Sequence, residues 1–165
     1  MTMDYRQDPV QSPNAPGASE DEAQIRCFVV FVGGEPLGLC VDYVQTIFGI
    51  DAVTPVPLGP REIIGLVNLR GKIVTAVSLR RRLDLPDPVD TRSMLAVGMD
   101  YRGENFALVV DEVGDVLHLN PQSRISLPPH LNDRRAKFTK AAYRLETGIL
   151  SLLDVAAIFD FPRHT

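Results

Sequence analysis

Short apolar segments separated by Gly- and Pro-containing turns recur along most of this 165-residue chain. Residues 27–32, 66–69 and 73–79 are rich in Val, Ile, Leu and Phe, and turn sequences such as Gly33-Gly34 lie between such segments. Strands that recur every 8–12 residues or so, with turn signals between them, are typical of small β-barrels. No long amphipathic helix is present to serve as the crossover of a parallel sheet. The chain is therefore expected to be all-β.

Two stretches of the sequence match each other and indicate a fold in two parts. Residues 41–47 and 110–116 both read Val-Asp-x-Val-x-x-apolar, and each follows a strand, a Gly-containing turn and a second strand. Chance similarity between hairpins is the alternative, but the order and context match as well as the letters. We expect two small barrels that repeat one structural plan.

Composition sets the predicted boundaries. Residues 1–23 hold several prolines and the acidic run Glu20-Asp21-Glu22 without hydrophobic periodicity, which predicts a disordered tail. Residues 24–161 form the predicted folded unit. The first barrel is expected at roughly 34–85, and the second at roughly 92–153 with the first strand of the chain added. Asp154 is predicted to cap a short C-terminal helix at 155–161.

The overall composition argues against several classes of protein. The chain is 45% hydrophobic, enough for a core, but it has no apolar run of about 18 residues that would predict a membrane span. No basic region followed by an apolar stretch indicates a secretory signal, so a cytoplasmic protein is expected. A net charge of −4 and the absence of Trp weigh against nucleic acid as a partner.

The sequence offers little catalytic chemistry. Cys27 and Cys40 lie in apolar runs, which favours free thiols over a disulfide or a ligand pair. The histidines, His118, His130 and His164, are scattered without a metal-binding spacing. Nucleophile-elbow and phosphate-binding motifs are absent from the sequence. The acidic residues at strand and helix ends are interpreted as structural. We therefore predict no catalytic residue, no metal and no cofactor.

Two basic clusters have open interpretations. Arg80-Arg81-Arg82 follows a strand, and Arg134, Arg135 and Lys137 lie in a long polar segment. Either cluster can be a solvated surface whose aliphatic stems cover the edge of the core, or a docking patch for an acidic protein surface or nucleic acid, of which a protein partner is favoured.

Asn68 and Arg70 are polar residues within the otherwise apolar segment 64–74. Burying a guanidinium is costly unless it is paired. Arg70 is therefore either neutralised by an internal partner or displayed at the end of a strand for another molecule. Both possibilities stay open at this point.

The sequence around these residues resembles the CheW family of chemotaxis coupling proteins. The likeness includes Pro55-x-Pro57, then Gly65-Leu66-Val67-Asn68-Leu69-Arg70-Gly71, and later Leu108-Val109-Val110-Asp111-x-Val113 and Ile149-Leu150-x-Leu152-Leu153-Asp154. It extends over about residues 24–161. The Asn-Leu-Arg-Gly element in this setting is the most specific part of it.

The resemblance implies two packed five-stranded SH3-like β-barrel subdomains with short helices and no enzymatic activity. It implies a cytoplasmic adaptor that holds a histidine kinase, through the kinase's own CheW-like regulatory domain, to the cytoplasmic tip of chemoreceptors, without inserting into the membrane itself. One barrel face would meet the kinase and the groove between the barrels would meet the receptor. Residues implied at or behind these surfaces are Val41, Val44, Thr46, Gly65, Asn68, Arg70 and Val113.

Four positions depart from the family pattern. Ser78 stands where an aspartate is usual, Thr46 where a glutamate is common, and Ala107 and Ala141 where glycines are common. The two lost carboxylates favour, as an alternative, a coupling protein of a parallel, non-flagellar chemosensory pathway. A rival of another class is a small β-barrel module that binds nucleic acid or a ligand, which the acidic charge and few aromatic residues oppose.

Overall fold

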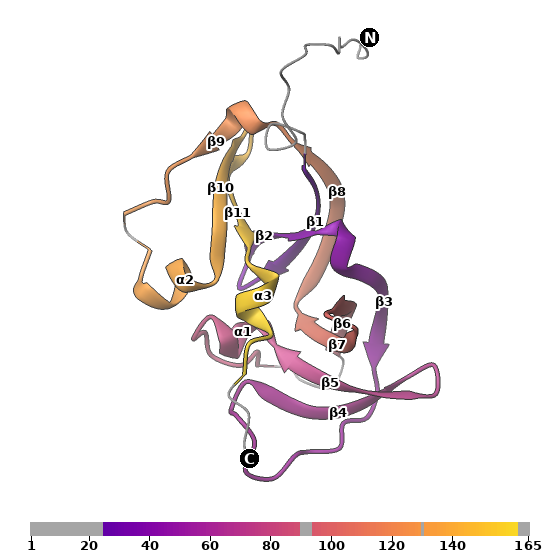
Figure 1. The fold of residues 1–165 in the computed structure, drawn as a ribbon. Helices are drawn as coiled ribbons and strands as arrows, with labels where there is room; N and C mark the ends of the chain where they lie inside the picture. The colour runs from indigo at the N-terminus through magenta and orange to yellow at the C-terminus, as the bar shows by residue number, and fades with distance from the viewer. Residues whose placement is uncertain (1–24, 90–93, 130, 162–165) are drawn as a thin grey trace.

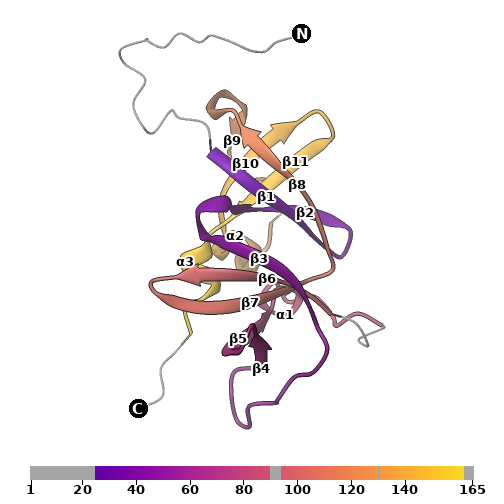
Figure 2. The same ribbon diagram turned by 90° about the vertical axis from the view of Figure 1, so that its right-hand side faces the viewer.

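A computed structural model describes residues 25–89, 94–129 and 131–161, so the predicted tail at 1–23 lies outside the described residues. The described residues form two β-sheets, stacked one above the other in Figures 1 and 2, with short helices at their margins. The fold is all-β in two subdomains, as predicted. No helix in the described ranges has the length and apolar character needed to cross a membrane.

The strands divide into a six-stranded sheet A and a five-stranded sheet B. Sheet A has the order β8-β1-β2-β11-β10-β9, and sheet B the order β3-β6-β7-β5-β4. The strands of sheet A are β1 Ile25–Val32, β2 Glu35–Cys40, β8 Glu112–Leu119, β9 Arg124–Ile125, β10 Thr139–Leu145 and β11 Gly148–Leu153. The strands of sheet B are β3 Val44–Ile50, β4 Ile63–Leu69, β5 Lys72–Ser78, β6 Met94–Tyr101 and β7 Glu104–Val110.

The two sheets follow one plan. Each centres on a hairpin, β1–β2 in sheet A and β6–β7 in sheet B, whose second strand pairs in parallel with β11 or β5. After each hairpin the chain leaves for the other sheet, through the 3₁₀ turn η3 Val41–Tyr43 into β3, and at Asp111 into β8. The two matching Val-Asp stretches lie at these crossings, which confirms the predicted structural repeat.

Each sheet curls towards a barrel. In sheet B, Thr54 and Leu66 exchange two backbone hydrogen bonds, of 2.9 and 2.8 Å, which join the segment after β3 to β4 at the other edge. In sheet A, β8 continues through the 3₁₀ turn η4 Pro121–Ser123 into β9, which pairs with β10. Closing the edges in this way leaves few unpaired backbone groups.

The strand pairing corrects the predicted division of the chain. The predicted boundaries place β2 in the first barrel, but it pairs with β1 and β11 in sheet A. They place β6 and β7 in the second barrel, but these strands lie in sheet B. The physical reason is the crossing described above, because each hairpin stays in one sheet while the next strand joins the other. Sheet A also has six strands rather than five, since the two-residue β9 is added at its edge.

Buried side chains form three clusters, one inside each barrel and one between them. The interior of barrel A includes Cys27, Val29, Tyr143 and Leu150, and that of barrel B includes Ile50, Val67, Val74 and Ala96. The largest cluster lies between the barrels and takes side chains from both sheets, among them Phe28, Leu39, Val77, Val97, Leu108 and Phe138. Burial of this shared apolar surface holds the barrels together.

A short helix follows one strand of each parallel pair, β5 in sheet B and β11 in sheet A. α1 Leu79–Arg82 begins after β5, where the Ser78 hydroxyl accepts a hydrogen bond of 3.1 Å from the Arg81 N–H. α3 Val155–Ile158 begins after β11, where the Asp154 carboxylate accepts one of 3.2 Å from the Ala157 N–H. Asp154 therefore caps the helix as predicted, but α3 ends at Ile158 rather than at residue 161.

The Ser78 cap explains one departure from the family pattern. Ser78 is buried and occupies the place that Asp154 has in the other half of the fold. Serine and aspartate are both good helix N-caps. The substitution therefore acts on the cap of α1, and the lost carboxylate does not lie at an exposed surface.

Three further local details refine the sequence prediction. Pro60 at a first helical position favours one helical turn over residues 60–64, but β4 already begins at Ile63, because its partner Val77 extends β5 to this point. The segment predicted as a long polar loop holds β9 and the short helix α2 Asp133–Lys137. Ala107 and Ala141 both point into barrel interiors and are absent from the residues with positive φ, so an alanine is tolerated at either position.

Candidate partner-binding surface

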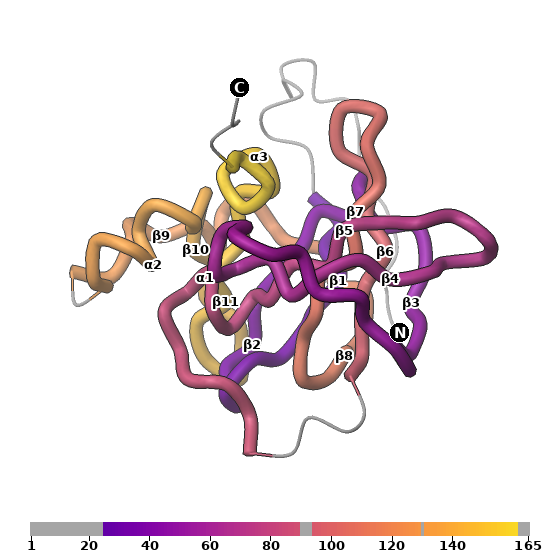
Figure 3. The backbone as a smooth tube through the Cα atoms, turned by 90° about the horizontal axis from the view of Figure 1, so that it is seen from below, coloured from indigo at the N-terminus to yellow at the C-terminus, as the bar shows by residue number. Residues whose placement is uncertain are grey.

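Arg70 and Gly71 form the two-residue turn between β4 and β5. Their φ angles are 54° and 86°, the left-handed values that a type I′ hairpin turn requires at both central residues. The Asn68 side-chain oxygen accepts a hydrogen bond of 2.9 Å from the Gly71 N–H and so fixes the turn. In Figure 3 this hairpin projects outward beyond its neighbouring strands. The Asn-Leu-Arg-Gly element is thus first of all a turn-forming sequence.

The Arg70 side chain is exposed at this projecting turn. Its Nη2 donates one long hydrogen bond of 3.4 Å to the Thr46 hydroxyl on β3. Among the described residues, no carboxylate lies within ion-pair distance of Arg70. Thr46 is uncharged, so no negative charge on the described residues compensates Arg70. Of the two possibilities raised by the sequence, Arg70 is displayed rather than neutralised internally.

An exposed apolar side chain lies on the same hairpin as this cation. Ile73 is opposite Asn68 in the β4–β5 ladder and is 65% exposed. Ile47 on β3 is also exposed, but it directly follows Thr46 and therefore faces the opposite side of the sheet. We call Thr46, Asn68, Arg70 and Ile73 the hairpin-tip surface. A cation together with an exposed apolar side chain is an arrangement found at protein interfaces.

Three other predicted residues lie in a different place. Val41, Val44 and Val113 are partly buried and pack against the cluster between the barrels. Val41 belongs to η3, Val44 begins β3 and Val113 lies on β8, so all three lie in or directly after the crossings between the sheets. The structure places them at the barrel junction, which adjoins the hairpin-tip surface along β3, where Val44 lies two residues before Thr46.

Gly65 is a packing position. It is buried in β4 with φ of +154°, and a Cβ built there would lie 2.4 Å from the Thr54 carbonyl oxygen and 2.7 Å from Val53 Cγ1. Thr54 is the residue whose backbone closes barrel B. Gly65 therefore has no surface to offer a partner directly, and it allows the close approach that positions the neighbouring loop.

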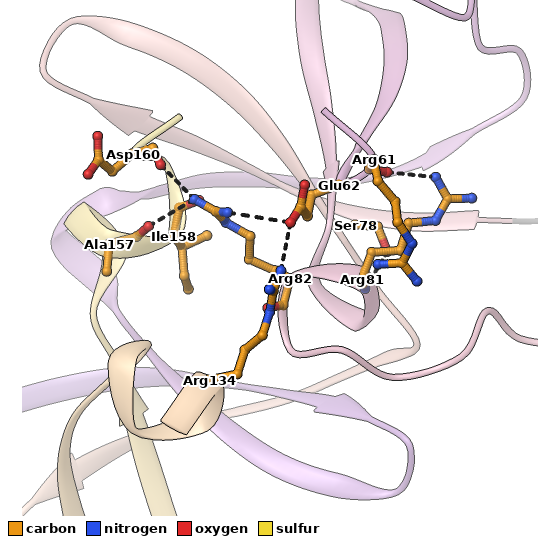
Figure 4. A network of polar contacts seen from close by, with 9 residues as sticks. All are labelled: Arg61, Glu62, Ser78, Arg81, Arg82, Arg134, Ala157, Ile158 and Asp160. Atoms are coloured by element: carbon orange, nitrogen blue, oxygen red, sulfur yellow. Dashed lines mark hydrogen bonds and ion pairs between the residues drawn. The ribbon is translucent and has the colours of Figure 1, made fainter. Parts of the chain in front are cut away.

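Most arginines of the two basic clusters form hydrogen bonds or ion pairs with other groups of the same chain. Arg82 is only 6% exposed, and its guanidinium donates hydrogen bonds to the backbone carbonyls of Ala157, Ile158 and Asp160 (Figure 4). The N–O distances are 3.1, 2.8 and 2.7 Å respectively. Because α1 follows sheet B and α3 follows sheet A, this one side chain ties the two barrels together.

Glu62 completes this network. Its carboxylate lies 2.6 Å from Arg134 Nη2 and 3.8 Å from Arg82 Nη1. Burial opposes ionisation of Glu62, but its hydrogen bonds and the two positive charges outweigh that effect and hold the pKa of this carboxyl below its ordinary value. Arg134 comes from α2 and Glu62 from the loop before β4, so this ion pair also bridges the two halves.

The remaining arginines of the clusters are paired as well. Arg80 makes a bidentate contact with Asp111 at 2.9 and 2.7 Å, and the same carboxylate accepts a hydrogen bond from the Gly33 N–H. The hydrogen bonds from Arg80 are the main cause that lowers the pKa of Asp111. Arg81 pairs with Asp87, and Arg135 with Glu35.

These pairs support neither of the two interpretations of the basic clusters. Neither cluster is the free basic patch that docking would require, and neither is merely solvated. The sequence did not reveal that these arginines connect the two barrels. The one signal was that Arg82 lies three residues after Leu79 and one before Leu83, and both leucines are buried.

An apolar hollow lies at the corner of sheet A that corresponds to the hairpin-tip surface in sheet B. It has a volume of about 490 Å³ and lies beside the β10–β11 hairpin. Its lining includes Phe31, Leu117, Leu145 and the exposed Ile149. Sequence reasoning did not single out these residues, because as isolated apolar letters in strands they resemble core positions.

Comparison with known proteins gives a consistent result. A family model described as the CheW-like domain matches residues 26–163. "Chemotaxis protein CheW" of Bacillus subtilis is 27% identical over 135 residues, which cover 82% of this chain and 86% of the relative. "Chemotaxis protein CheW" of Klebsiella aerogenes is 28% identical over 129 residues, which cover 78% of each. The crystal structure of the scaffolding protein TtCheW from Thermoanaerobacter tengcongensis has a similar fold, with a TM-score of 0.73, 21% identity, and coverage of 84% of this chain and 94% of that one.

Proposed function

Because the chain belongs to the CheW-like domain family, we propose that it is a non-catalytic adaptor that couples chemoreceptors to a chemotaxis-type histidine kinase. The observation that carries this proposal beyond family membership is the exposed Arg70, which pairs with no carboxylate among the described residues and lies on the same projecting hairpin as the exposed Ile73. The role requires two docking surfaces on one rigid body and no reacting groups. The adaptor would act in the cytoplasm and join membrane arrays through its partners.

We assign the receptor tip to the barrel junction together with the hairpin-tip surface. Val41, Val44 and Val113 give the junction an apolar lining, and Arg70 supplies a cation for a carboxylate on the partner. We assign the CheW-like regulatory domain of the kinase to the apolar corner of sheet A around Ile149. The two assignments place one partner on each side of the fold.

The hydrogen bonds and the ion pair that connect the two barrels support this mechanism. An adaptor transmits a change between partners only if its two docking surfaces hold a fixed relation to each other. The Arg82 contacts to α3 and the Arg134–Glu62 pair supply that fixed relation. Each contact with a partner alone is expected to be modest, about −8 kcal/mol or micromolar, and to be strengthened by multivalency within an array.

Co-sedimentation tests the proposal. Vesicles that carry chemoreceptors are mixed with the kinase, with and without this chain, and the pelleted kinase is measured. We expect the kinase to pellet in quantity only when the chain is present, and not when the kinase lacks its regulatory domain. Kinases and receptors from flagellar and from parallel pathways are compared in the same assay to identify the pathway.

The opposite outcome has a distinct signature. If the chain leaves the pelleted kinase unchanged with every receptor and kinase tried, but retards single-stranded DNA in a low-salt gel at micromolar concentration, the nucleic-acid-binding alternative replaces the adaptor.

A further inference from the structure

Two free cysteines face each other across the central hairpin of sheet A. Cys27 on β1 is the register partner of Cys40 on β2, and both are thiols in this structure. The proposed function uses neither residue. Because they lie opposite each other, a disulfide between them depends on the distance and orientation that the strand pairing imposes.

The ladder between β1 and β2 fixes the geometry of the pair. The hairpin has a two-residue turn, Gly33-Gly34, so its closing pair Val32–Glu35 is hydrogen-bonded. Hydrogen-bonded and non-hydrogen-bonded pairs alternate along an antiparallel ladder, and the register runs without a bulge to Cys27–Cys40. Counting back from the turn makes Cys27–Cys40 a non-hydrogen-bonded pair.

An independent contact confirms this count. Phe31, four residues after Cys27 on β1, belongs to the same class of pair, so its carbonyl must point away from β2. The Phe31 carbonyl oxygen does accept a hydrogen bond of 3.0 Å from the Asp111 N–H, on the far side of β1. Its partner Pro36 has no N–H to donate to β1.

A non-hydrogen-bonded pair is the closer of the two kinds. Its Cα atoms lie about 4.5 Å apart, and disulfides span Cα separations of about 4.4–6.8 Å. Both side chains point to the interior face of barrel A. Gly38, two residues before Cys40 on the same face, has no side chain, and a Cβ built there would lie only 3.2 Å from the Cys27 sulfur. The glycine therefore leaves room for the Cys27 sulfur beside its partner.

The two thiols differ in access. Cys27 is fully buried, and burial is the main cause that raises its pKa to about 11, so it is held as a neutral thiol. Cys40 is partly exposed at the end of β2. An oxidant from solvent therefore reacts with Cys40 first, and Cys27 lies where it can react with the oxidised Cys40 sulfur.

We propose that Cys27 and Cys40 are a reversible oxidation site that forms an intramolecular disulfide in response to a hydroperoxide. The Cys40 thiolate attacks one peroxide oxygen, the O–O bond breaks, and Cys40 becomes a sulfenic acid while hydroxide leaves and takes up the thiol's proton as water. The Cys27 sulfur then attacks the Cys40 sulfur, the S–O bond breaks, and the Cys27 proton leaves with the hydroxide as a second water. With hydrogen peroxide, two thiols are oxidised to one disulfide and one peroxide is reduced to two waters.

The position gives this bond a structural consequence. Cys40 directly precedes η3, the crossing that leads into β3. The disulfide would tether this crossing to β1, next to Val41 at the barrel junction.

Mass spectrometry of the full chain tests the proposal. The reduced protein is treated with hydrogen peroxide, unfolded in acid, blocked with a maleimide and digested without reductant by chymotrypsin, which cuts after Phe31 between the two cysteines. We expect fragments that hold Cys27 and Cys40 to stay joined, lighter by two hydrogens than the separate thiols, with loss of maleimide at both sites and full recovery after dithiothreitol.

A matched variant separates this pairing from general oxidation. In Cys40→Ser, Cys27 should remain a thiol under the same treatment, because it is buried and has lost the partner that meets the oxidant. Three results would overturn the proposal: both cysteines of the wild-type protein still take up maleimide, the bond found joins Cys40 residues of two chains, or Cys27 is oxidised equally fast in Cys40→Ser.

Discussion

Replacement of Arg82 by alanine probes the joint between the two barrels. Arg82 lies on α1, after sheet B, and donates three hydrogen bonds of 2.7 to 3.1 Å to backbone carbonyls at the end of α3, after sheet A. Its guanidinium also lies over the rings of Phe138 and Phe161, 4.8 and 4.2 Å from their centroids. In Arg82→Ala the carbonyls of a helix end lose their donors and Glu62 loses one of its two cations.

The magnitude follows from these contacts. A hydrogen bond to a charged group contributes about 1.5–3 kcal/mol net, and breaking a buried charged network costs about 3–5 kcal/mol. The three bonds act together and are not additive, so we expect a loss of about 4 kcal/mol in the free energy of unfolding. For a chain of this size that corresponds to a Tm lower by about 10 °C.

Urea denaturation followed by circular dichroism measures this loss. Arg81→Ala is the matched control, since Arg81 is the adjacent arginine but pairs with a half-exposed Asp87, a contact worth about 0.2–1 kcal/mol. Arg82→Met keeps the aliphatic stem and should recover only the packing part of the loss. The reasoning fails if Arg82→Ala and Arg81→Ala have the same stability within about 1 kcal/mol, which exceeds the usual scatter for surface changes.

Three further predictions concern stability. Gly65→Ala should destabilise the fold by about 3 kcal/mol or more, because the new Cβ lies 2.4 Å from the Thr54 carbonyl oxygen. Gly71 has open space around it, so Gly71→Ala should lose only the stability that a positive φ costs an alanine, and equal urea midpoints for the two variants would contradict this reasoning. Ser78→Ala should lower stability by about 1 kcal/mol through loss of the α1 cap and Ser78→Asp should preserve it, which thermal melts of the three proteins decide. The pKa values of Glu62 and Asp111 are lowered in the folded state, so their contribution to stability is complete above their ordinary pKa values of 4.5 and 3.8 and is lost as the pH falls below them. The urea midpoint should therefore fall on acidification, and it should fall less steeply in Asp111→Asn. An unchanged dependence of the midpoint on pH in that variant would show that Asp111 does not contribute.

The fold was largely predictable because it depends on local patterns. The hairpin at Gly33-Gly34 and the turn at Arg70-Gly71 follow from turn chemistry, and the repeated letters Val-Asp-x-Val mark the two crossings between the sheets. What could not be predicted is which sheet each strand joins. β2 and β7 have apolar residues on both faces, so their sequences do not indicate a sheet. Only the long-range pairing of β2 with β11 and of β7 with β5 determines which sheet each strand joins.

The candidate surface was predictable only in part. Arg70 stood out because a charge within an apolar run needs a reason, and the structure supplies one in its exposed turn. The role of Gly65 as a contact point for barrel closure depends on Thr54, eleven residues earlier in a loop without periodicity, so no local signal could indicate it. The burial of Arg82 likewise depends on carbonyls more than seventy residues later in the chain.

The most direct test of the adaptor proposal compares charge reversal at two matched arginines. Arg70 and Arg102 are both exposed, both precede a glycine in a two-residue hairpin turn, and both have a positive φ, of 54° and 55°. Each variant, Arg70→Glu and Arg102→Glu, is titrated into a mixture of receptor cytoplasmic fragment and kinase regulatory domain, after its urea midpoint has shown that it is folded. The adaptor account predicts that Arg70→Glu weakens assembly at least tenfold, about 1.4 kcal/mol, while Arg102→Glu assembles like the wild type. Equal assembly by both variants, or unfolding of Arg70→Glu alone, would contradict it.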